Sequence, residues 1–312
     1  MQYGLIGEKL GHSFSREIHE SLGLYSYELA EVARDQLDAF MQARDFAGIN
    51  VTIPYKEAVI PFLDAMSDRA REVGAVNTIV NRDGRLFGDN TDVGGLQALI
   101  RRMGLELRGK TVLIAGTGGT SKTAHAVARS LGAARVVKLS RSSQASGDGQ
   151  PGNGGMLDGQ ASGSGQTDGG QTDDSGQPGG GQTDGGQTGG HAGDDRAGNG
   201  ASSCGVLSYE QAYEQLSDAQ VLINTTPAGM YPNVEGIPVD LSRLPGLEGV
   251  VDVVYNPLIT RLVREARERG LKAENGLYML VVQALLAAEA FVGEPFSESR
   301  ADKLYESMTQ GR

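Results

Sequence analysis

Thr111-Val112-Leu113-Ile114-Ala115-Gly116-Thr117-Gly118-Gly119 is the stretch of sequence that decides the fold of this chain. Its first five residues are apolar or β-favouring and predict a buried strand, and the glycines after them predict a tight turn. A helical pattern then continues to residue 131, and a second strand is predicted at 135–139. Strand, turn, helix and strand together form a βαβ unit, the building block of parallel sheets.

The glycines of this turn, Gly116, Gly118 and Gly119, predict a site for a dinucleotide. Without side chains they let the backbone approach a pyrophosphate, and the helix start offers unpaired N–H groups and a positive dipole end. Ser121 stands where the motif G-x-G-x-x-G has its third glycine, so a glycine-rich turn without a ligand is the plain alternative. The complete βαβ context favours the dinucleotide.

A competing prediction comes from residues 116–123, which differ from the nucleoside triphosphate loop G-x-x-x-x-G-K-[ST] only at Ser121. A site of that kind would make the chain an NTP-utilising protein such as a kinase. The triphosphate loop needs its second glycine to cradle phosphates, and no later strand clearly ends in a magnesium-binding aspartate. We therefore rank this P-loop-like alternative well below the dinucleotide site.

Cofactor selectivity is expected about twenty residues after the glycines, at the end of the second strand. There the chain has Leu139-Ser140-Arg141-Ser142 and no acid that could bind a ribose hydroxyl. A guanidinium flanked by hydroxyl groups suits the 2′-phosphate of NADP. Ser140 and Arg141 therefore favour NADP over NAD, although an exposed arginine at a strand end is common.

The rest of the chain also alternates strands with helices, which predicts an α/β fold. Before Thr111 the pattern predicts strands at 3–7, 26–31, 48–53, 75–81 and 85–88, and helices at 16–22, 35–44 and 93–103. After residue 204 it predicts helices at 209–217, 261–269 and 277–291, and strands at 221–224 and 249–254. The second set indicates a doubly wound domain around the βαβ unit.

Residues 143–204 interrupt that domain with near-repeats of Gly-Gln-Thr-Asp-Gly-Gly. Such a tract buries too little apolar surface to offset chain entropy, so we expect a disordered low-complexity insertion. Loop-closure cost grows slowly with length, which favours a tolerated surface insertion over a docking segment. From Asp148 to Arg196 the tract carries eight Asp and one Arg, which is most of the net charge of −11.

Composition excludes several classes of protein. The chain outside the insertion is only mildly acidic, which argues against nucleic-acid binding. Cys204 is the only cysteine, so neither an intrachain disulfide nor a cysteine-based zinc site can form, and no apolar stretch is long enough for a membrane span. The first residues lack the pattern of a signal peptide, and we expect a cytoplasmic protein.

Polar residues at strand ends in the first hundred residues are candidates for chemistry. Lys56 and Asp92 could pass a proton to or from a hydroxyl as hydride moves, which a ketone–alcohol dehydrogenase requires. A surface lysine and an aspartate that caps the following helix are the plain alternative. Ser13 and Ser15 put two hydroxyls at a helix start, which suits a substrate carboxylate or a helix cap.

Taken in order, eight segments of the chain resemble the shikimate dehydrogenase family. The resemblance runs nearly from end to end and is interrupted only by the insertion. The segments are 11–15 (GHSFS), 50–56 (NVTIPYK), 74–78 (GAVNT), 88–92 (GDNTD), 116–119 (GTGG), 224–230 (NTTPAGM), 252–257 (DVVYNP) and 275–280 (NGLYML).

This resemblance implies a reversible, NADPH-dependent reduction of 3-dehydroshikimate to shikimate, within chorismate and aromatic amino-acid biosynthesis. It implies an N-terminal α/β substrate domain of residues 1–104, completed by C-terminal helices within 276–312, and a Rossmann-type dinucleotide-binding domain of residues 105–275. The implied ligands are a small-molecule substrate and NADP, without a metal, and the sequence leaves a homodimer open. A quinate/shikimate dehydrogenase that uses NAD is the near alternative.

The family also implies roles for individual residues. Lys56 and Asp92 would form the catalytic pair. The substrate would be bound by residues from both ends of the chain: Ser13, Ser15, Thr52, Asn77, Asp92, Tyr255 and Gln283. The cofactor would be bound by residues of the second domain and the segment that follows it: Gly116, Gly118, Gly119, Ser140, Arg141, Thr225, Met230, Val253 and Gly276.

Overall fold

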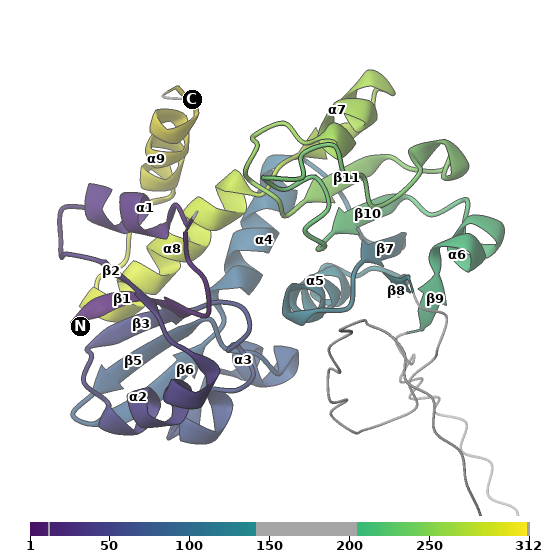
Figure 1. Cartoon of the computed structure of the whole chain (residues 1–312). Coiled ribbons are helices and arrows are strands. Elements are labelled where there is room, and N and C mark those ends of the chain that lie inside the picture. Colours follow the sequence, from purple (N-terminus) through teal and green to yellow (C-terminus); the bar gives the residue numbers. More distant parts are fainter. Residues whose placement is uncertain (12, 142–204, 311–312) are drawn as a thin grey trace, which may run out of the picture. The chain divides into compact units, whose positions relative to one another are not determined.

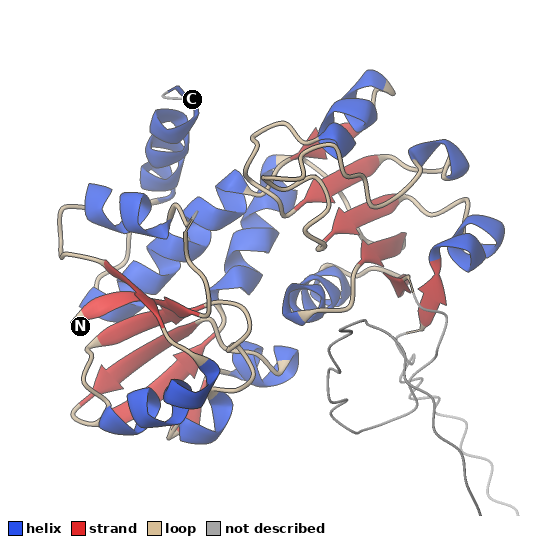
Figure 2. Ribbon diagram, in the orientation of Figure 1, coloured by secondary structure: helices blue, strands red, loops and turns tan. Residues whose placement is uncertain are grey.

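Figure 1 shows the computed structural model of the chain, which describes residues 1–11, 13–141 and 205–310. His12 and the insertion predicted at 143–204 lie outside the described residues. The described chain folds into two six-stranded sheets with helices around them (Figure 2), so the predicted α/β fold is confirmed. In the described parts of the chain, no helix combines the length and the apolar character that crossing a membrane requires.

The first sheet mixes parallel and antiparallel strands. Its order is β2 (Glu28–Glu31), β1 (Tyr3–Gly7), β3 (Gly48–Val51), β5 (Thr78–Arg82), β6 (Arg85–Asp89) and β4 (Ala65–Met66). β1 is parallel to both neighbours, whereas β5 is antiparallel to β3 and β6. Between β5 and β6, Asp83 and Gly84 both have positive φ, which a tight Asp-Gly hairpin turn requires.

Helices from both ends of the chain surround this first sheet (Figure 1). They are α1 (Ser15–Ser21), α2 (Leu37–Ala43), α3 (Asp68–Val73), α4 (Thr91–Arg102), α8 (Leu277–Val292) and α9 (Glu298–Gln310), with short 3₁₀ turns η1 (Arg34–Gln36) and η2 (Ile60–Phe62). α8 contacts α1, α4 and β5, so a late helix packs among early elements. Phe291 of α8 is buried beside Leu5 of β1 in one apolar cluster.

The second sheet is entirely parallel. Its order is β9 (Val206–Ser208), β8 (Arg135–Ser140), β7 (Thr111–Ala115), β10 (Val221–Asn224), β11 (Gly249–Asp252) and β12 (Lys272–Glu274). Counted along the chain from β7, that order is 3-2-1-4-5-6, the arrangement of Rossmann-type folds, and it reverses between β7 and β10. Ligands of such sheets bind outside the carboxyl ends of the strands at this reversal.

The helices of the second sheet begin at recognisable signals. They are α5 (Gly119–Ser130), α6 (Tyr209–Gln215) and α7 (Arg261–Glu268), with the 3₁₀ turn η3 (Leu241–Arg243). Ser208 and Gln211 form a reciprocal capping box at α6, and the Thr260 hydroxyl caps α7 by accepting from Val263 N. α5 instead has Gly118 as its N-cap and no side-chain cap. Ser121 N donates to Gly118 O, so the N–H groups of Gly119 and Thr120 are the ones that remain available to a ligand.

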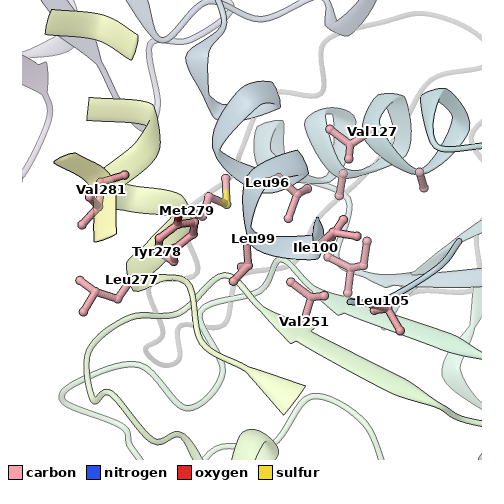
Figure 3. Packing of buried hydrophobic residues seen from close by; sticks show 14 of the residues in the cluster. Leu96, Leu99, Ile100, Leu105, Val127, Val251, Leu277, Tyr278, Met279 and Val281 are labelled. Atoms are coloured by element: carbon pink, nitrogen blue, oxygen red, sulfur yellow. The ribbon is translucent and has the colours of Figure 1, made fainter. Parts of the chain in front are cut away.

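An apolar core joins α4 and α8 to the second sheet. In Figure 3, Leu99 of α4 lies between Tyr278 of α8 and Val251 of β11, and Leu96 of α4 belongs to the same cluster. The two leucines are 0% and 1% exposed, and burying each such side chain contributes about 1.5–3 kcal/mol. Through this core the start of α8 packs against α4, an element of the N-terminal part of the chain.

Two predicted boundaries differ from the structure in a way that matters for the site. The strand predicted at 75–81 begins only at Thr78, because Gly74 ends α3 with a left-handed turn and the next residues leave it as a loop. The helix predicted at 93–103 begins at Thr91, with Asn90 as its N-cap. Asp92 therefore lies inside the first turn of α4 instead of before the helix.

Candidate active site

A cavity of about 550 Å³ opens at the carboxyl ends of β1 and β3 and continues to loops of the second sheet. Its wall contains all eight residues expected in the catalytic pair or at the substrate: Ser13, Ser15, Thr52, Lys56, Asn77, Asp92, Tyr255 and Gln283. Three of the residues expected at the cofactor, Met230, Val253 and Gly276, line the same cavity. Segments more than two hundred residues apart in sequence thus meet in one hollow.

Lys56 and Asp92 form an ion pair in this wall. Lys56 Nζ lies 2.6 Å from Asp92 Oδ2, and the two side chains are 16% and 9% exposed. Asp92 occupies the first turn of α4, where the positive end of the helix dipole stabilises a carboxylate. The alternative of a surface lysine and a helix-capping aspartate therefore does not hold. The N-cap of α4 is Asn90, and the side chains of Lys56 and Asp92 are hydrogen-bonded to each other.

Ser13 and Ser15 stand where the loop after β1 enters α1. The N-cap of α1 is Phe14 and makes no side-chain cap, so the alternative of a Ser15 cap does not apply. Ser13 Oγ accepts a 3.3 Å hydrogen bond from Ser15 N, which leaves the Ser13 O–H free to donate elsewhere. Both hydroxyls line the cavity and present it with donors but no positive charge.

The amide of Asn77 is oriented by its neighbours. Its Oδ1 accepts a 2.7 Å hydrogen bond from Thr91 N, and the Thr78 hydroxyl donates to the same oxygen at 3.0 Å. Its Nδ2 lies 3.0 Å from Thr91 Oγ1 and 3.5 Å from Gln283 Oε1. The oxygen accepts these hydrogen bonds inside the protein, and one of the two N–H groups is held only by the long 3.5 Å contact with Gln283 Oε1. That N–H is the group that Asn77 can offer a ligand, and it donates to hydroxyl or carbonyl oxygen.

A second buried layer supports Asn77 from behind, and the sequence did not single it out. Asn50 Nδ2 donates to Thr78 Oγ1 at 3.0 Å, and Asn50 Oδ1 accepts from the Tyr27 hydroxyl at 2.6 Å. The Tyr27 ring stacks on His19 with centroids 4.0 Å apart. Burial lowers the pKa of His19 to about 3, so this histidine is neutral and unsuited to act as a base near pH 7. Asn50 lies in one of the quoted segments, but nothing in its spacing indicates a supporting role.

The glycines after β7 have the geometry that a dinucleotide requires. Gly116 has φ +107°, and a Cβ there would lie 2.8 Å from Thr225 Oγ1, beside the end of β10. A Cβ at Gly118 or Gly119 would meet no atom within 4 Å, so open space lies against these two residues at the start of α5. Gly116 and Thr225 thus flank the point at which the strand order reverses, as expected for a phosphate site.

The remaining residues expected at the cofactor lie along the same edge of the second sheet. Ser140 ends β8, next to β7, and Arg141 follows it as an exposed side chain. A Cβ at Gly276 would lie 2.1 Å from Val253 O, so only glycine lets these two segments touch. Gly116, Gly118, Gly119, Ser140, Arg141 and Thr225 do not line the cavity itself. They lie outside the cavity, where the far end of a long ligand would bind.

Ser121 does not act as part of a triphosphate loop. Its side chain is fully buried, and its hydroxyl donates to Gly118 O at 2.6 Å. The hydroxyl therefore stabilises the turn from inside. Together with the 3-2-1-4-5-6 strand order, this hydrogen bond argues against the P-loop-like alternative.

A buried carboxylate behind the second sheet's loops was also missed from the sequence. Asp252 is fully buried, and it accepts hydrogen bonds from Asn224 Nδ2 at 2.9 Å, from Val254 N at 3.1 Å and from Thr260 Oγ1 at 2.7 Å. Burial raises the pKa of Asp252 to about 6 against the opposing effect of these hydrogen bonds. The carboxylate connects the end of β10, the segment after β11 and the N-cap of α7.

Comparisons with known proteins agree with this geometry. The shikimate dehydrogenase substrate binding domain family matches residues 5–79. A shikimate dehydrogenase (NADP(+)) from Geobacillus kaustophilus is 35% identical over 302 residues, which cover 94% of this chain and 92% of that protein. Among solved structures, shikimate dehydrogenase 1 from Peptoclostridium difficile has a TM-score of 0.74 at 28% identity and covers 99% of this chain and 98% of its own.

A further solved structure is similar and carries ligands. Shikimate 5-dehydrogenase from Thermus thermophilus, in complex with NADP(H) and shikimate, has a TM-score of 0.69 at 27% identity and covers 98% of this chain and 99% of its own. Sequence similarity to the Geobacillus protein extends over nearly the full length of both chains, with the fold and the cavity in agreement. This chain therefore belongs to the shikimate dehydrogenase family.

Proposed function

We propose that this chain is an NADP-dependent shikimate dehydrogenase, which reversibly reduces 3-dehydroshikimate to shikimate. The observation that carries the proposal is the Lys56–Asp92 pair, 2.6 Å apart, in a cavity that also contains donors for a carboxylate and for ring hydroxyls. Membership of the family supports the type of reaction, and the cavity is the site where the substrate would bind. We assign residues 1–104 and the helices within 276–312 to a substrate domain, and residues 105–275 to a cofactor domain.

Substrate binding is proposed to use neutral hydrogen-bond donors. The hydroxyls of Ser13 and Ser15 would hold the carboxylate. Ser13 Oγ accepts a hydrogen bond from Ser15 N, so the hydrogen of the Ser13 hydroxyl remains to be donated to the substrate. The Asn77 N–H would donate to a ring hydroxyl, with Thr52 and Gln283 beside it in the wall. Tyr255 would close the cofactor side, where burial raises the pKa of its hydroxyl and keeps it a neutral donor.

The residues at the edge of the second sheet fit NADP. The open space at Gly118 and Gly119 and the uncapped start of α5 suit a pyrophosphate, and the exposed Arg141 beside Ser140 suits a 2′-phosphate. Met230, Val253 and Gly276 would line the nicotinamide, since they are the cofactor-side residues that reach the cavity. When bound, NADPH supplies the hydride that reduces the ring ketone.

Lys56 is proposed to manage the proton of the reaction. In reduction the Lys56 ammonium would give a proton to the carbonyl oxygen as the carbon gains hydride, and in oxidation the amine would take it back. Asp92 would hold the ammonium in place from the first turn of α4 and contact the substrate hydroxyl with its other oxygen. The low exposure of both side chains excludes much of the water that would otherwise compete for this proton.

An absorbance assay at the nicotinamide band tests the proposal. Purified protein would be supplied with shikimate or quinate, each with NADP⁺ or NAD⁺. We expect rapid reduction of the cofactor only with shikimate and NADP⁺. Activity with quinate or NAD⁺ would assign the chain to the quinate/shikimate group, and no reduction in any of the four mixtures would contradict the proposed function.

A further inference from the structure

An ion pair connects the segment of Lys56 to the start of α5. Lys122 Nζ lies 2.8 Å from Glu57 Oε2, and the side chains are 37% and 54% exposed. Glu57 is the residue after Lys56 in sequence, and Lys122 is the fourth residue of α5, three positions after Gly119. The pair therefore joins the proposed proton donor's segment to the proposed pyrophosphate site.

The carboxylate of Glu57 is paired with a lysine of the first turn of α5, the helix whose start is the proposed pyrophosphate site. The first turn of α5 contains no acidic residue and has no side-chain cap, and the space against Gly118 and Gly119 is open. Both features favour an anion at this helix start. Lys122 is the lysine within the first two turns of α5, and its ammonium is paired with the Glu57 carboxylate. Glu57 thus places a negative charge beside the cation that a bound anion would otherwise use.

We infer that Glu57 competes with the cofactor's pyrophosphate for Lys122 and so lowers cofactor affinity in exchange for a link between the cofactor site and the Lys56 segment. The inference rests on the proposed function, because it needs NADP at the start of α5. When the pyrophosphate arrives, Lys122 turns from the Glu57 carboxylate to the phosphates, and the segment of Lys56 is released from α5. Since coupling between two sites is reciprocal, whatever favours the Glu57–Lys122 pair disfavours the bound cofactor.

Isothermal titration calorimetry with NADP⁺ tests this inference on the full chain. We expect Glu57→Gln to tighten NADP⁺ binding about two- to fivefold, the range that an exposed ion pair spans. The gain should shrink at high ionic strength, because salt screens exposed charges. Added to Lys122→Gln, the same substitution should give a smaller gain, because no lysine is left to be released.

Glu248→Gln is the matched control. Glu248 pairs with Lys110 at 2.6 Å and is also 54% exposed, but neither residue lines the cavity or borders the glycines. This variant should bind NADP⁺ like the unaltered protein. Unchanged or weaker binding by Glu57→Gln, with normal binding by the unaltered protein, would overturn this inference alone. Failure of the unaltered protein to bind NADP⁺ would overturn the proposed function and this inference with it.

Discussion

Asp92 and Asp252 are both buried carboxylates at or shortly after the end of a strand, yet their surroundings differ. Asp92 faces a cavity and has a lysine 2.6 Å away. Asp252 is fully enclosed and is bonded by an amide, a backbone N–H and a hydroxyl, all of them neutral. A carboxylate with a cation and access to a ligand can take part in proton chemistry, whereas one enclosed by neutral donors holds segments together.

The pKa of Asp252 shows why a shifted pKa alone does not identify a catalytic group. Burial raises the pKa of Asp252 to about 6, near the range in which general acids work. No substrate could reach this side chain, because its oxygens are occupied and it does not line the cavity. The geometry of access therefore separates the two aspartates, and the following predictions test that separation.

The largest expected effect is that of Lys56→Met. Losing the group that takes the hydroxyl proton should lower kcat for shikimate oxidation by about 10²–10⁴-fold. The Kd for NADPH should stay within about threefold, less than 1 kcal/mol, because Lys56 lies on the substrate side of the cavity. Stopped-flow turnover and fluorescence titration of NADPH measure the two quantities. Full activity of this variant would remove Lys56 from the mechanism.

Asp92→Asn should have the next largest effect. The amide keeps the size of the side chain but loses the charge that holds the Lys56 ammonium, so we expect kcat to fall by about 10²-fold, at the low end of acid–base contributions. The variant should remain folded at the assay temperature, although loss of the ion pair lowers its melting temperature. If kcat stayed within a factor of about three, half a power of ten, Asp92 would serve only to pack the start of α4.

Asp252→Asn should change the pH dependence of stability. An acid whose pKa is higher in the folded than in the unfolded protein stabilises the fold fully below its unfolded pKa of about 4, and this contribution is lost as pH rises through its folded pKa of about 6. The unaltered protein should therefore lose on the order of 2–3 kcal/mol relative to Asp252→Asn between pH 4 and 7. Urea unfolding at a series of pH values measures this difference, and parallel curves for the two proteins would show that Asp252 does not titrate there.

Thr260→Val should have the smallest effect. The substitution keeps the shape of the side chain but removes the hydroxyl that caps α7 and donates to Asp252. We expect the free energy of unfolding to fall by about 1–2 kcal/mol. Thr260→Ser, which keeps the hydroxyl, is the matched control and should fall by less. Equal losses in both variants would mean that the methyl group and not the hydrogen bond stabilises this corner.

The fold was largely predictable from the sequence, because its signals are local. The β7 strand, the glycines and α5 follow one another within twenty residues, and hydrophobic periodicity located most other elements. α3 was missed although its signals were present, namely Ser67 as a capping residue and Gly74 as a left-handed end. β4 and β12 have two and three residues, too few for any period to be read.

The site was predictable in part, and only through resemblance for its distant members. Lys56 and Asp92 could be suggested from their positions after strands, but spacing could not bring Gln283 beside Asn77. That proximity depends on the packing of α8 against α4 and β5. The supporting residues Asn50 and Asp252 could not be assigned, because a buried polar residue is recognised only when its partners in three dimensions are known.

The turnover numbers of Asp92→Asn and Asp252→Asn, measured side by side with shikimate and NADP⁺ near pH 7, test the central claim most directly. The account predicts that Asp92→Asn loses about two orders of magnitude in kcat while remaining folded, and that Asp252→Asn keeps kcat within about tenfold of the unaltered protein. The opposite pattern, with Asp252→Asn inactive and Asp92→Asn active, would contradict the assignment of the proton chemistry to the cavity.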